Sequence, residues 1–543
     1  MRSWVRVALL LSAVLASVWL GWSRFLGAGR DDMFLTLWSG LQLARGEGLI
    51  NHDGVPLEVS SSLLHTWVVA LLALVDAESL VLSNKLAGLA ALLGTLVLLA
   101  GPGRSLLGRG AESVPALALV LAITATTPSL VYWSLGGLET GLAVLLWTAL
   151  PLALARASED ASRWRALAGI GSLFVLTRPE GLLVLLLAAT LFVALGKRGP
   201  SPALKRGALV WLLTFAAVSA WRLSTFDSLW PNPVLAKADP TLDDVLRGAR
   251  YVVGLYTSSW LMAALGAVLL VTLGRAVRTR SGGDVTLAIL SAVVAQHAFV
   301  VATGGDWMEH HRFLQPIVPL LAILLARGLG DRLSGPVGAP RLVLCAALLG
   351  LLLQNQEQAS TVRSDKWAMD STALTAHGPA PEARGLTERT LAANAVWRRD
   401  AEDLFPYLEE NLAGLAERTG EPLVLATPQM GQLPWFLRQR LSEIPVELVD
   451  TRGLCDPDLA RLDAARGPFG LAAGADLAGI VAGDRGALSE AVRARRPNLL
   501  YRVRETEQGI ARLGTLGFEL VHRGPGSMVF LREGPWRELG AEE

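Results

Sequence analysis

Two adjacent carboxylates, Asp31 and Asp32, closely follow the first apolar segment of the chain. The basic side chains that could work with them occur much later, between other apolar segments: Arg178, Arg222, Lys237 and Arg312. A carboxylate can accept the proton of an attacking hydroxyl, and these cations can neutralise a phosphate, arginine through a bidentate fork. The alternative is that Asp31 and Asp32 form a solvated helix end and that Arg178 pairs with Glu180 to join two short helices.

Further polar residues accompany these groups in the same inter-helix segments. They are Glu58, Glu139, Glu180, Asn232, Asp306, His310 and His311. Charged groups at membrane depth are costly unless they are paired or face a polar cavity, so their clustering indicates function. The two histidines are adjacent and do not share a helix face, which argues against a joint metal site. The metal content stays open.

The composition predicts a membrane protein. Of 543 residues, 52% are hydrophobic and only 18% are charged, with a mean hydropathy of +0.42, whereas soluble domains are about a quarter charged. The net charge of +1 argues against binding of nucleic acid. Charged residues become frequent after residue 354, so we expect a transmembrane domain over 1–354 and a soluble domain over 355–543.

Eleven apolar segments are candidates to cross the bilayer, since a crossing needs about 20 mostly apolar residues. They are 7–23, 82–100, 114–130, 138–155, 166–177, 181–196, 207–221, 252–273, 285–303, 314–330 and 341–354. The apolar segment 63–75 is too short to span, and we expect it to be an interfacial or re-entrant helix within an outer loop over 24–81. The first segment lacks a convincing cleavage site and is interpreted as a retained helix.

Lysine and arginine recur in alternate loops and fix the predicted orientation. The basic loops contain Arg104, Arg109, Arg156, Arg163, Arg165, Lys197, Arg198, Lys205, Arg206, Arg275, Arg278, Arg280, Arg327, Arg332 and Arg341. By the positive-inside rule these loops are cytoplasmic. We therefore expect a multi-pass protein of the bacterial inner membrane with a cytoplasmic N-terminus. The candidate site residues and the segment 355–543 are then extracytoplasmic.

The C-terminal segment has the pattern of a small α/β domain. An amphipathic helix is expected over Glu388–Leu415 and another over Leu488–Arg495. Strand-like runs occur at Pro422–Thr427, Pro445–Asp450, Asn498–Val503, Phe518–Val521 and Met528–Leu531. Two roles are open for this domain, one in holding a glycan acceptor and one as a structural lid. No disulfide is expected between Cys345 and Cys455, since one is in an apolar run and the other in the polar part.

Several stretches in order along the chain resemble the GT-C glycosyltransferases, and more narrowly the mycobacterial terminal β-(1→2)-arabinofuranosyltransferase group. They are DDMFLTLWSGLQLARGEGLINHDGVPLE (31–58), GGLETGLAVLL (136–146), LTRPEG (176–181), LWPNPVLAKA (229–238), GGDWMEHHRFLQPIVPL (304–320), GQLPWF (431–436) and VDTRGLCDPDLAR (449–461). The resemblance implies a membrane enzyme that moves a sugar from a polyprenyl-phosphate donor to a glycan or glycolipid acceptor on the extracytoplasmic face. It also implies a polytopic helical fold.

The resemblance assigns roles to the residues above. Asp31, ahead of Asp32, is the expected catalytic carboxylate. The four cations bind the donor phosphate, and the remaining polar residues orient the cations or the sugar; some family members also use a divalent cation. The chain departs from the family pattern at Val59-Ser60-Ser61, where Gly-Tyr-Thr is usual, and at His65, near the usual tryptophan. The sugar or acceptor can therefore differ from arabinofuranose and arabinan.

Two other functions fit part of the pattern. A transporter or flippase of a polar lipid needs intramembrane charges, but it is expected to carry them at the bilayer midplane and often to show repeats. A non-catalytic glycan-binding subunit would have no need of the Asp31-Asp32 pair.

Overall fold

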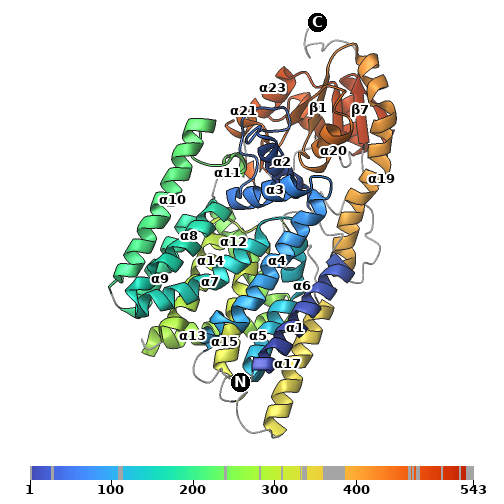
Figure 1. Ribbon diagram of the computed structural model, residues 1–543. Coiled ribbons are helices and arrows are strands. Elements are labelled where there is room, and N and C mark those ends of the chain that lie inside the picture. Colours follow the sequence, from blue (N-terminus) through green and yellow to red (C-terminus); the bar gives the residue numbers. More distant parts are fainter. Residues whose placement is uncertain are drawn as a thin grey trace.

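A body of long helices and a smaller α/β domain are stacked end to end (Figure 1). The computed structural model describes residues 3–25, 30–107, 114–197, 199–237, 241–279, 283–306, 308, 310–329, 332, 339–358, 386–462, 466–467, 470–471, 477–502, 506–524 and 528–533. The helical body is formed by residues up to 358, and the α/β domain by residues from 386 onward. This division agrees with the change in composition near residue 354.

Each of the eleven predicted spans falls on a helix. These are α1 (Ser3–Leu20), α4 (Leu80–Ala100), α5 (Val114–Thr126), α7 (Thr140–Glu159), α8 (Trp164–Thr177), α9 (Gly181–Gly196), α10 (Pro202–Phe226), α13 (Trp260–Thr279), α14 (Asp284–Ala302), α15 (Val318–Gly328) and α17 (Ala339–Gln358). Within the described residues, six helices are long and apolar enough to cross a membrane alone. A seventh span results if α5 and α6 (Pro128–Leu135) count as one, bent by 52°.

Two predicted spans differ in detail from the structure. The segment 252–273 is interrupted, because α12 (Leu242–Thr257) ends before Ser259, whose hydroxyl accepts the amide hydrogen of Met262 and so starts α13. The segment 314–330 begins as the 3-10 helix η5 (Arg312–Ile317) and becomes α-helical only in α15. Pro316 within η5 cannot donate a backbone hydrogen bond, which explains the irregular start.

The predicted interfacial segment is the helix α3 (Leu63–Val75), which packs along α2 (Asp31–Arg45) at the end of the body nearest the α/β domain (Figure 1). A Cβ atom on Gly40 would lie 2.4 Å from a methyl carbon of Val69, so glycine permits this close crossing. The opposite face of α3 exposes Leu71 and Leu74. A helix of 13 residues with an unpartnered apolar face suits a membrane interface.

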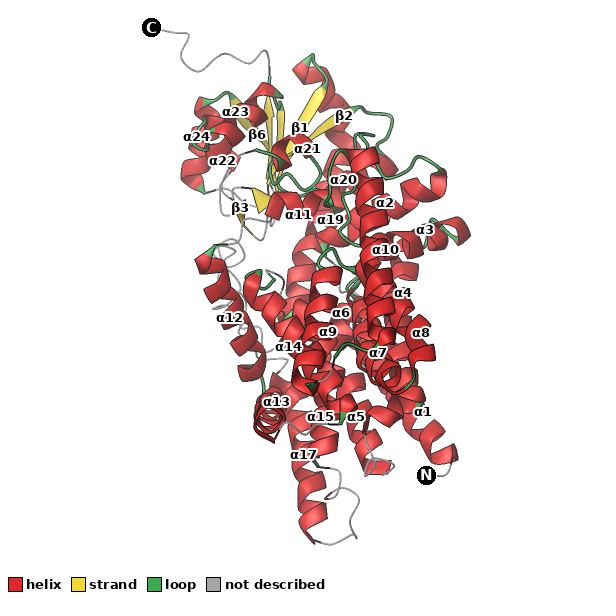
Figure 2. Ribbon diagram, turned by 90° about the vertical axis from the view of Figure 1, so that its left-hand side faces the viewer, coloured by secondary structure: helices red, strands yellow, loops and turns green. Residues whose placement is uncertain are grey.

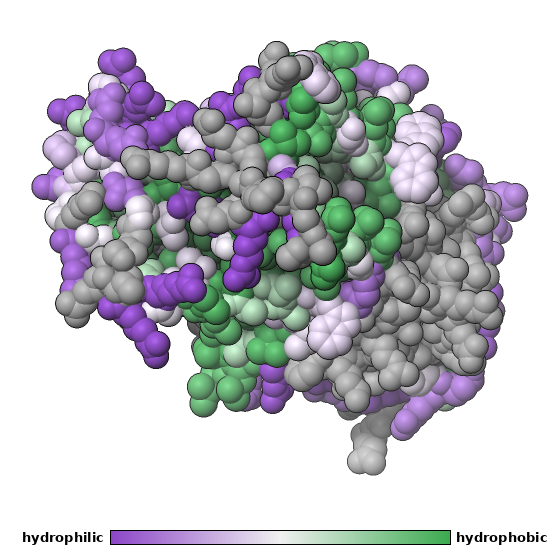
Figure 3. All heavy atoms as spheres, turned by 90° about the horizontal axis from the view of Figure 1, so that it is seen from below, coloured by the Kyte–Doolittle hydropathy of each residue, from purple (hydrophilic) through white to green (hydrophobic). Residues whose placement is uncertain are grey.

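The basic loops gather at the opposite end of the body. The Arg156 guanidinium donates to the carbonyl of Pro102 (3.3 Å), and that of Arg327 donates to the carbonyl of Leu106 (2.7 Å). The Ser158 hydroxyl donates to Asp284 (2.8 Å) and ties a third pair of segments together. Hydrophilic side chains rim this end of the molecule around an apolar centre (Figure 3). The helix ends that contain Arg156, Arg327 and Asp284 are therefore neighbours of other segments at one end of the body.

The α/β domain has a five-stranded sheet in the order β2-β1-β5-β7-β6. Its strands are β1 (Leu423–Thr427), β2 (Val446–Asp450), β5 (Leu499–Arg502), β6 (Phe518–Arg523) and β7 (Met528–Arg532). They match the five predicted strands. The strand β1 is parallel to β2 and β5, whereas β7 is antiparallel to its neighbours. A two-residue pair, β3 (Arg466–Gly467) with β4 (Gly470–Leu471), was not predicted.

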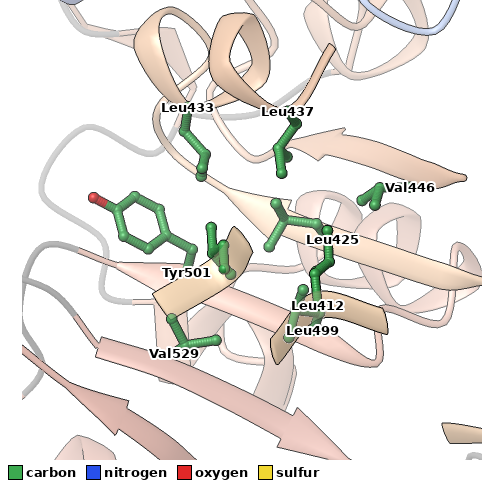
Figure 4. A pocket seen from close by; sticks show the side chains of 9 residues that line it. Leu412, Leu425, Leu433, Leu437, Val446, Leu499, Tyr501 and Val529 are labelled. Carbon is green, nitrogen blue, oxygen red and sulfur yellow. The ribbon is translucent and has the colours of Figure 1, made fainter. Parts of the chain in front are cut away.

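Helices cover both faces of this sheet. One face packs on α19 (Leu386–Thr419) and α20 (Gln432–Arg440), and the other on α22 (Leu477–Ala482), α23 (Ala487–Ala494) and α24 (Glu507–Thr515) (Figure 2). In Figure 4, Leu433 and Leu437 of α20 lie over Leu425, and the small pocket between them is lined by apolar side chains. A core of this kind fixes α20 on the sheet. Both cysteines are free thiols, and Cys455 is buried, whereas Cys345 is exposed.

Candidate active site

The predicted polar residues meet at the end of the helical body that carries the α/β domain. Arg178, just after α8, bridges two carboxylates: its Nη1 lies 2.5 Å from Glu139 Oε1 and its Nε lies 2.7 Å from Glu180 Oε1. Arg178 and its two carboxylate partners are all largely buried, so they form one enclosed ion-pair group.

A second arginine lies beside the first. Arg312 Nε contacts Asp306 Oδ2 at 2.5 Å, and its guanidinium is 4.9 Å from the ring centroid of Phe313. Arg178 approaches the same ring at 4.5 Å. Both arginines line one small cavity, together with Phe174 and Gln296. This cavity has room for about one water molecule, and both guanidinium groups are already paired with carboxylates.

Arg222 and Asn232 hold the first loop and the α/β domain. Arg222, in α10, donates from Nε and Nη2 to the two carboxylate oxygens of Glu58, at 2.6 and 2.8 Å. The backbone amide of Asn232, at the start of α11 (Asn232–Lys237), donates to the carbonyl of Glu58 (3.1 Å). Its side-chain amide donates to the carbonyls of Gly453 (2.8 Å) and Leu454 (2.9 Å). The side chains of Arg222, Glu58 and Asn232, which were predicted to contact the substrate, are therefore engaged in contacts within the protein.

Asp31 begins α2 and is held by the α/β domain. Its Oδ2 accepts the backbone amide hydrogen of Gly431 (3.0 Å), and its Oδ1 accepts that of Gln432 (2.7 Å), at the start of α20. Loss of hydration raises the pKa of Asp31 to about 7, assisted by the charges of Asp32 and Asp450 and opposed by the two amides. The residue keeps partial exposure. A carboxylate with a pKa near the working pH is suited to general-base catalysis.

Asp32 has a different partner. Its Oδ2 lies 3.9 Å from Lys237 Nζ, and 22% of the Asp32 side chain and 29% of the Lys237 side chain are exposed. A pair this open and this long is held weakly. Lys237 can therefore turn toward a phosphate with little loss of stability.

The two histidines pack as rings. His310 and His311 have left-handed backbone conformations, with φ of 61° and 54°. Their rings stand edge-on to Tyr132 and Tyr251, at centroid distances of 5.2 and 4.9 Å. Burial lowers the pKa of His311 to about 4, so it is neutral at physiological pH. In the described part of the chain, no group of three or more His, Cys, Asp or Glu side chains is arranged to hold a metal ion.

The sequence analysis did not predict three residues of the α/β domain that act on Asp31: Gly431, Gln432 and Asp450. The stretches that contain them were noted for their resemblance only. Their signal is that each follows a predicted strand, Gly431 shortly after β1 and Asp450 at the end of β2. The carboxyl ends of parallel strands are the usual functional edge of α/β domains.

The arrangement of both domains has counterparts among solved structures. The crystal structure of ArnT from Cupriavidus metallidurans bound to undecaprenyl phosphate covers 98% of each chain with a TM-score of 0.55 at 13% identity. Its apo form matches over the same share with a TM-score of 0.52 at 15% identity.

The chain has the ArnT fold. The predicted resemblance to GT-C glycosyltransferases is thereby confirmed for the fold. The arabinofuranosyltransferase AftD from Mycobacteria matches 98% of this chain and 40% of its own, with a TM-score of 0.50 at 14% identity. The chain therefore spans less than half of AftD. No family model and no curated protein sequence matches it.

Proposed function

We propose that this protein is a membrane glycosyltransferase that moves a sugar from a polyprenyl-phosphate donor to an acceptor hydroxyl. One observation carries the proposal. A carboxylate whose pKa is raised to about 7, Asp31, lies at the same end of the body as a cavity lined by Arg178 and Arg312. The ArnT fold supports it, since an ArnT structure contains undecaprenyl phosphate.

The residues divide the reaction between them. Asp31 accepts the proton of the acceptor hydroxyl while that oxygen bonds to the anomeric carbon of the sugar. The bond from this carbon to the phosphate oxygen breaks, and its electron pair leaves with the phosphate. Lys237, whose pair with Asp32 is long and open, neutralises the departing charge, and Arg178 and Arg312 contribute when the phosphate displaces one of their carboxylate partners. Glu139, Glu180 and Asp306 keep the two arginines in place through the ion pairs described above.

The remaining predicted residues act less directly. The guanidinium of Arg222 donates to both carboxylate oxygens of Glu58 and so holds the first loop against α10. The Asn232 side chain links that loop to the α/β domain by its hydrogen bond to Gly453. His310 and His311 support the loop before η5 through their contacts with Tyr132 and Tyr251. We assign these residues to shaping the site. Asp32 steadies Lys237 or the positive charge that develops on the sugar.

The sugar is a finer question, and arabinofuranose is the first to test because AftD is an arabinofuranosyltransferase. The departure from the family pattern at 59–61 lies against α2, where the Ser60 hydroxyl is 3.1 Å from that of Thr36. Thr36 is one helical turn beyond Asp32 and shares its face. Changes at this position alter the surroundings of the site, and a pentose panel should therefore include sugars other than arabinose.

The test is turnover by the purified protein in lipid vesicles. Polyprenyl-phosphate sugars are supplied one at a time with a glycan acceptor, and release of polyprenyl phosphate and extension of the acceptor are measured. We expect one donor to be consumed by the wild type and by none of the variants Asp31→Ala or Asp31→Asn. Movement of these lipids between leaflets without turnover of any donor would instead favour the transporter.

A further inference from the structure

The α/β domain meets Asp31 through the edge of its sheet where parallel strands end. The strand β1 ends at Thr427 and leads to α20, and β2 ends at Asp450. In domains of this type, ligands are bound at that edge. Here the edge is occupied by the membrane domain itself, because Gly431 and Gln432 donate their amide hydrogens to the Asp31 carboxylate.

Glycine at 431 is required by this contact. Its φ of −97° is one that residues with side chains adopt, so the backbone conformation alone does not demand glycine. A Cβ atom there would lie 2.0 Å from the carbonyl oxygen of Asp31 and 2.6 Å from its Oδ1. Both distances are far below contact distance. The α/β domain therefore carries its smallest residue at the point where it touches the predicted base.

The two amides fix the plane of the carboxylate. One donates to each oxygen, at 3.0 and 2.7 Å; Gly431 is the N-cap and Gln432 the first residue of the nine-residue helix α20. The partial positive charge of a helix N-terminus favours an anion at this position. The ionised form of Asp31 is therefore held in one orientation by a domain that begins more than 350 residues later in the chain.

The charges around Asp31 come from both domains. Asp32 faces it from α2 and is paired with Lys237. Asp450, at the end of β2, accepts amide hydrogens from Arg452 (2.8 Å) and Cys455 (2.7 Å), and its charge disfavours the ionised form of Asp31. The Cys455 thiol is also within the electrostatic reach of Asp31, and burial raises its pKa well above its usual value, so it stays neutral.

We infer that the α/β domain is part of the catalytic apparatus: the amides of Gly431 and Gln432 orient the Asp31 carboxylate. The inference rests on the proposed function for its catalytic consequence only. It differs from the two roles open at the outset, acceptor holding and a lid, since it makes the domain necessary for the chemical step. Gly431 and Gln432 are positioning residues.

The first experiment is the variant Gly431→Ala, compared with Gly414→Ala. Gly414 is an exposed glycine in α19 with open space around its Cβ position, so it controls for the added methyl group. We expect Gly431→Ala to reduce kcat about 100-fold, the cost of a misplaced catalytic group, with the donor KM within about twofold of wild type. Wild-type kcat in Gly431→Ala, or an equal loss in both variants, would overturn the inference.

The second experiment is the pH profile of Asp450→Asn. Removing the negative charge makes ionisation of Asp31 easier, so the acidic limb of kcat should move to lower pH. A structural role alone would lower the amplitude and leave the limb in place. If the acidic limb does not move in a folded, active Asp450→Asn protein, the charge of Asp450 does not influence the ionisation of Asp31.

The third experiment needs no turnover. Hydrogen–deuterium exchange of a peptide that contains residues 431 and 432 is compared between wild type and Asp31→Ala, with a peptide from β7 as the internal reference. We expect faster exchange of the two amides in Asp31→Ala and unchanged exchange in β7. Unchanged exchange of both peptides would refute the hydrogen bonds between the two amides and Asp31, even in an active enzyme. Faster exchange of the two amides with no turnover by the wild type would support these hydrogen bonds and refute the proposed function.

Discussion

Asp31 and Asp32 are neighbours in the sequence but have different environments. Asp31 is fixed by two amides and loses hydration, whereas Asp32 contacts the partly exposed ammonium of Lys237. Sites that separate the properties of two carboxylates in this way assign them different roles. Both side chains lie in the first turn of α2, where successive residues point in different directions.

The pH dependence follows from the raised pKa of Asp31. A base must be ionised, so transfer should increase as pH rises through about 7 and should be low at pH 5. Stability should show the opposite sign. A carboxyl whose pKa is about 7 when folded and 3.8 when unfolded favours folding below pH 4, and this contribution is lost as pH rises to 7. Thermal unfolding of wild type and Asp31→Asn from pH 4 to 8 should therefore give a flatter pH dependence for Asp31→Asn.

The pair of Glu58 and Arg222 separates a structural role from a substrate role. Both side chains are buried, with 3% and 6% exposure. Arg222→Met leaves Glu58 as an uncompensated buried charge and should destabilise the protein by about 3–5 kcal/mol. The double variant Glu58→Gln with Arg222→Met removes both charges and should recover most of that loss, as measured by thermal unfolding. Recovered stability without recovered transfer would instead assign Arg222 to the phosphate.

At the scale of elements, hydrophobic runs and strand patterns predicted most of the fold. Each of the eleven apolar segments is helical, and the five strands match, because both signals depend on local periodicity. The break at Ser258–Ser259 was missed, since apolar residues flank it on both sides. The residues that contact Asp31 from the α/β domain could not be predicted from the sequence either. Gly431 meets Asp31 across 400 residues, and nothing local to either residue specifies that contact.

Two helices that position the site cross at glycines. A Cβ atom on Gly88 of α4 would lie 2.1 Å from the carbonyl oxygen of Ser134, and one on Gly141 of α7 would lie 2.6 Å from that of Gly88. Gly88→Ala should therefore cost about 2 kcal/mol and lower the Tm in detergent. Gly94→Ala, in the same helix with 3.5 Å to the flexible Leu145 side chain, should be tolerated. An equal Tm for both variants would mean that α4 can shift away from the Ser134 carbonyl in α6.

At the scale of the whole molecule, the two ends of the helical body differ in chemistry. The hydrogen bonds of Arg156 and Arg327 join the basic loops at one end. The ion pairs of Arg178 and Arg312 join the candidate site at the other. Because lysine and arginine in short loops mark the cytoplasmic side, we propose that the site and the α/β domain are extracytoplasmic.

Labelling of single cysteines tests this orientation in intact cells. In a Cys345→Ser background, Ser162→Cys reports on the basic end, whereas Thr241→Cys and Thr515→Cys report on the site end and the α/β domain; all three positions are exposed. A membrane-impermeant maleimide should label the cysteines at 241 and 515 but reach that at 162 only after permeabilisation. Labelling of 241 and 162 from the same side would leave no shared compartment for the proposed reaction.

The contact between Asp31 and α20 has a consequence for biosynthesis. The helix that begins with Asp31 enters the bilayer region early in translation, yet its amide partners are separated from it by 400 residues and follow the last apolar helix of the body. A nascent chain therefore holds an unoriented base until the ribosome has nearly finished. If the proposed reaction needs the oriented carboxylate, truncated chains that end after α17 should accumulate in the membrane without turning over substrate.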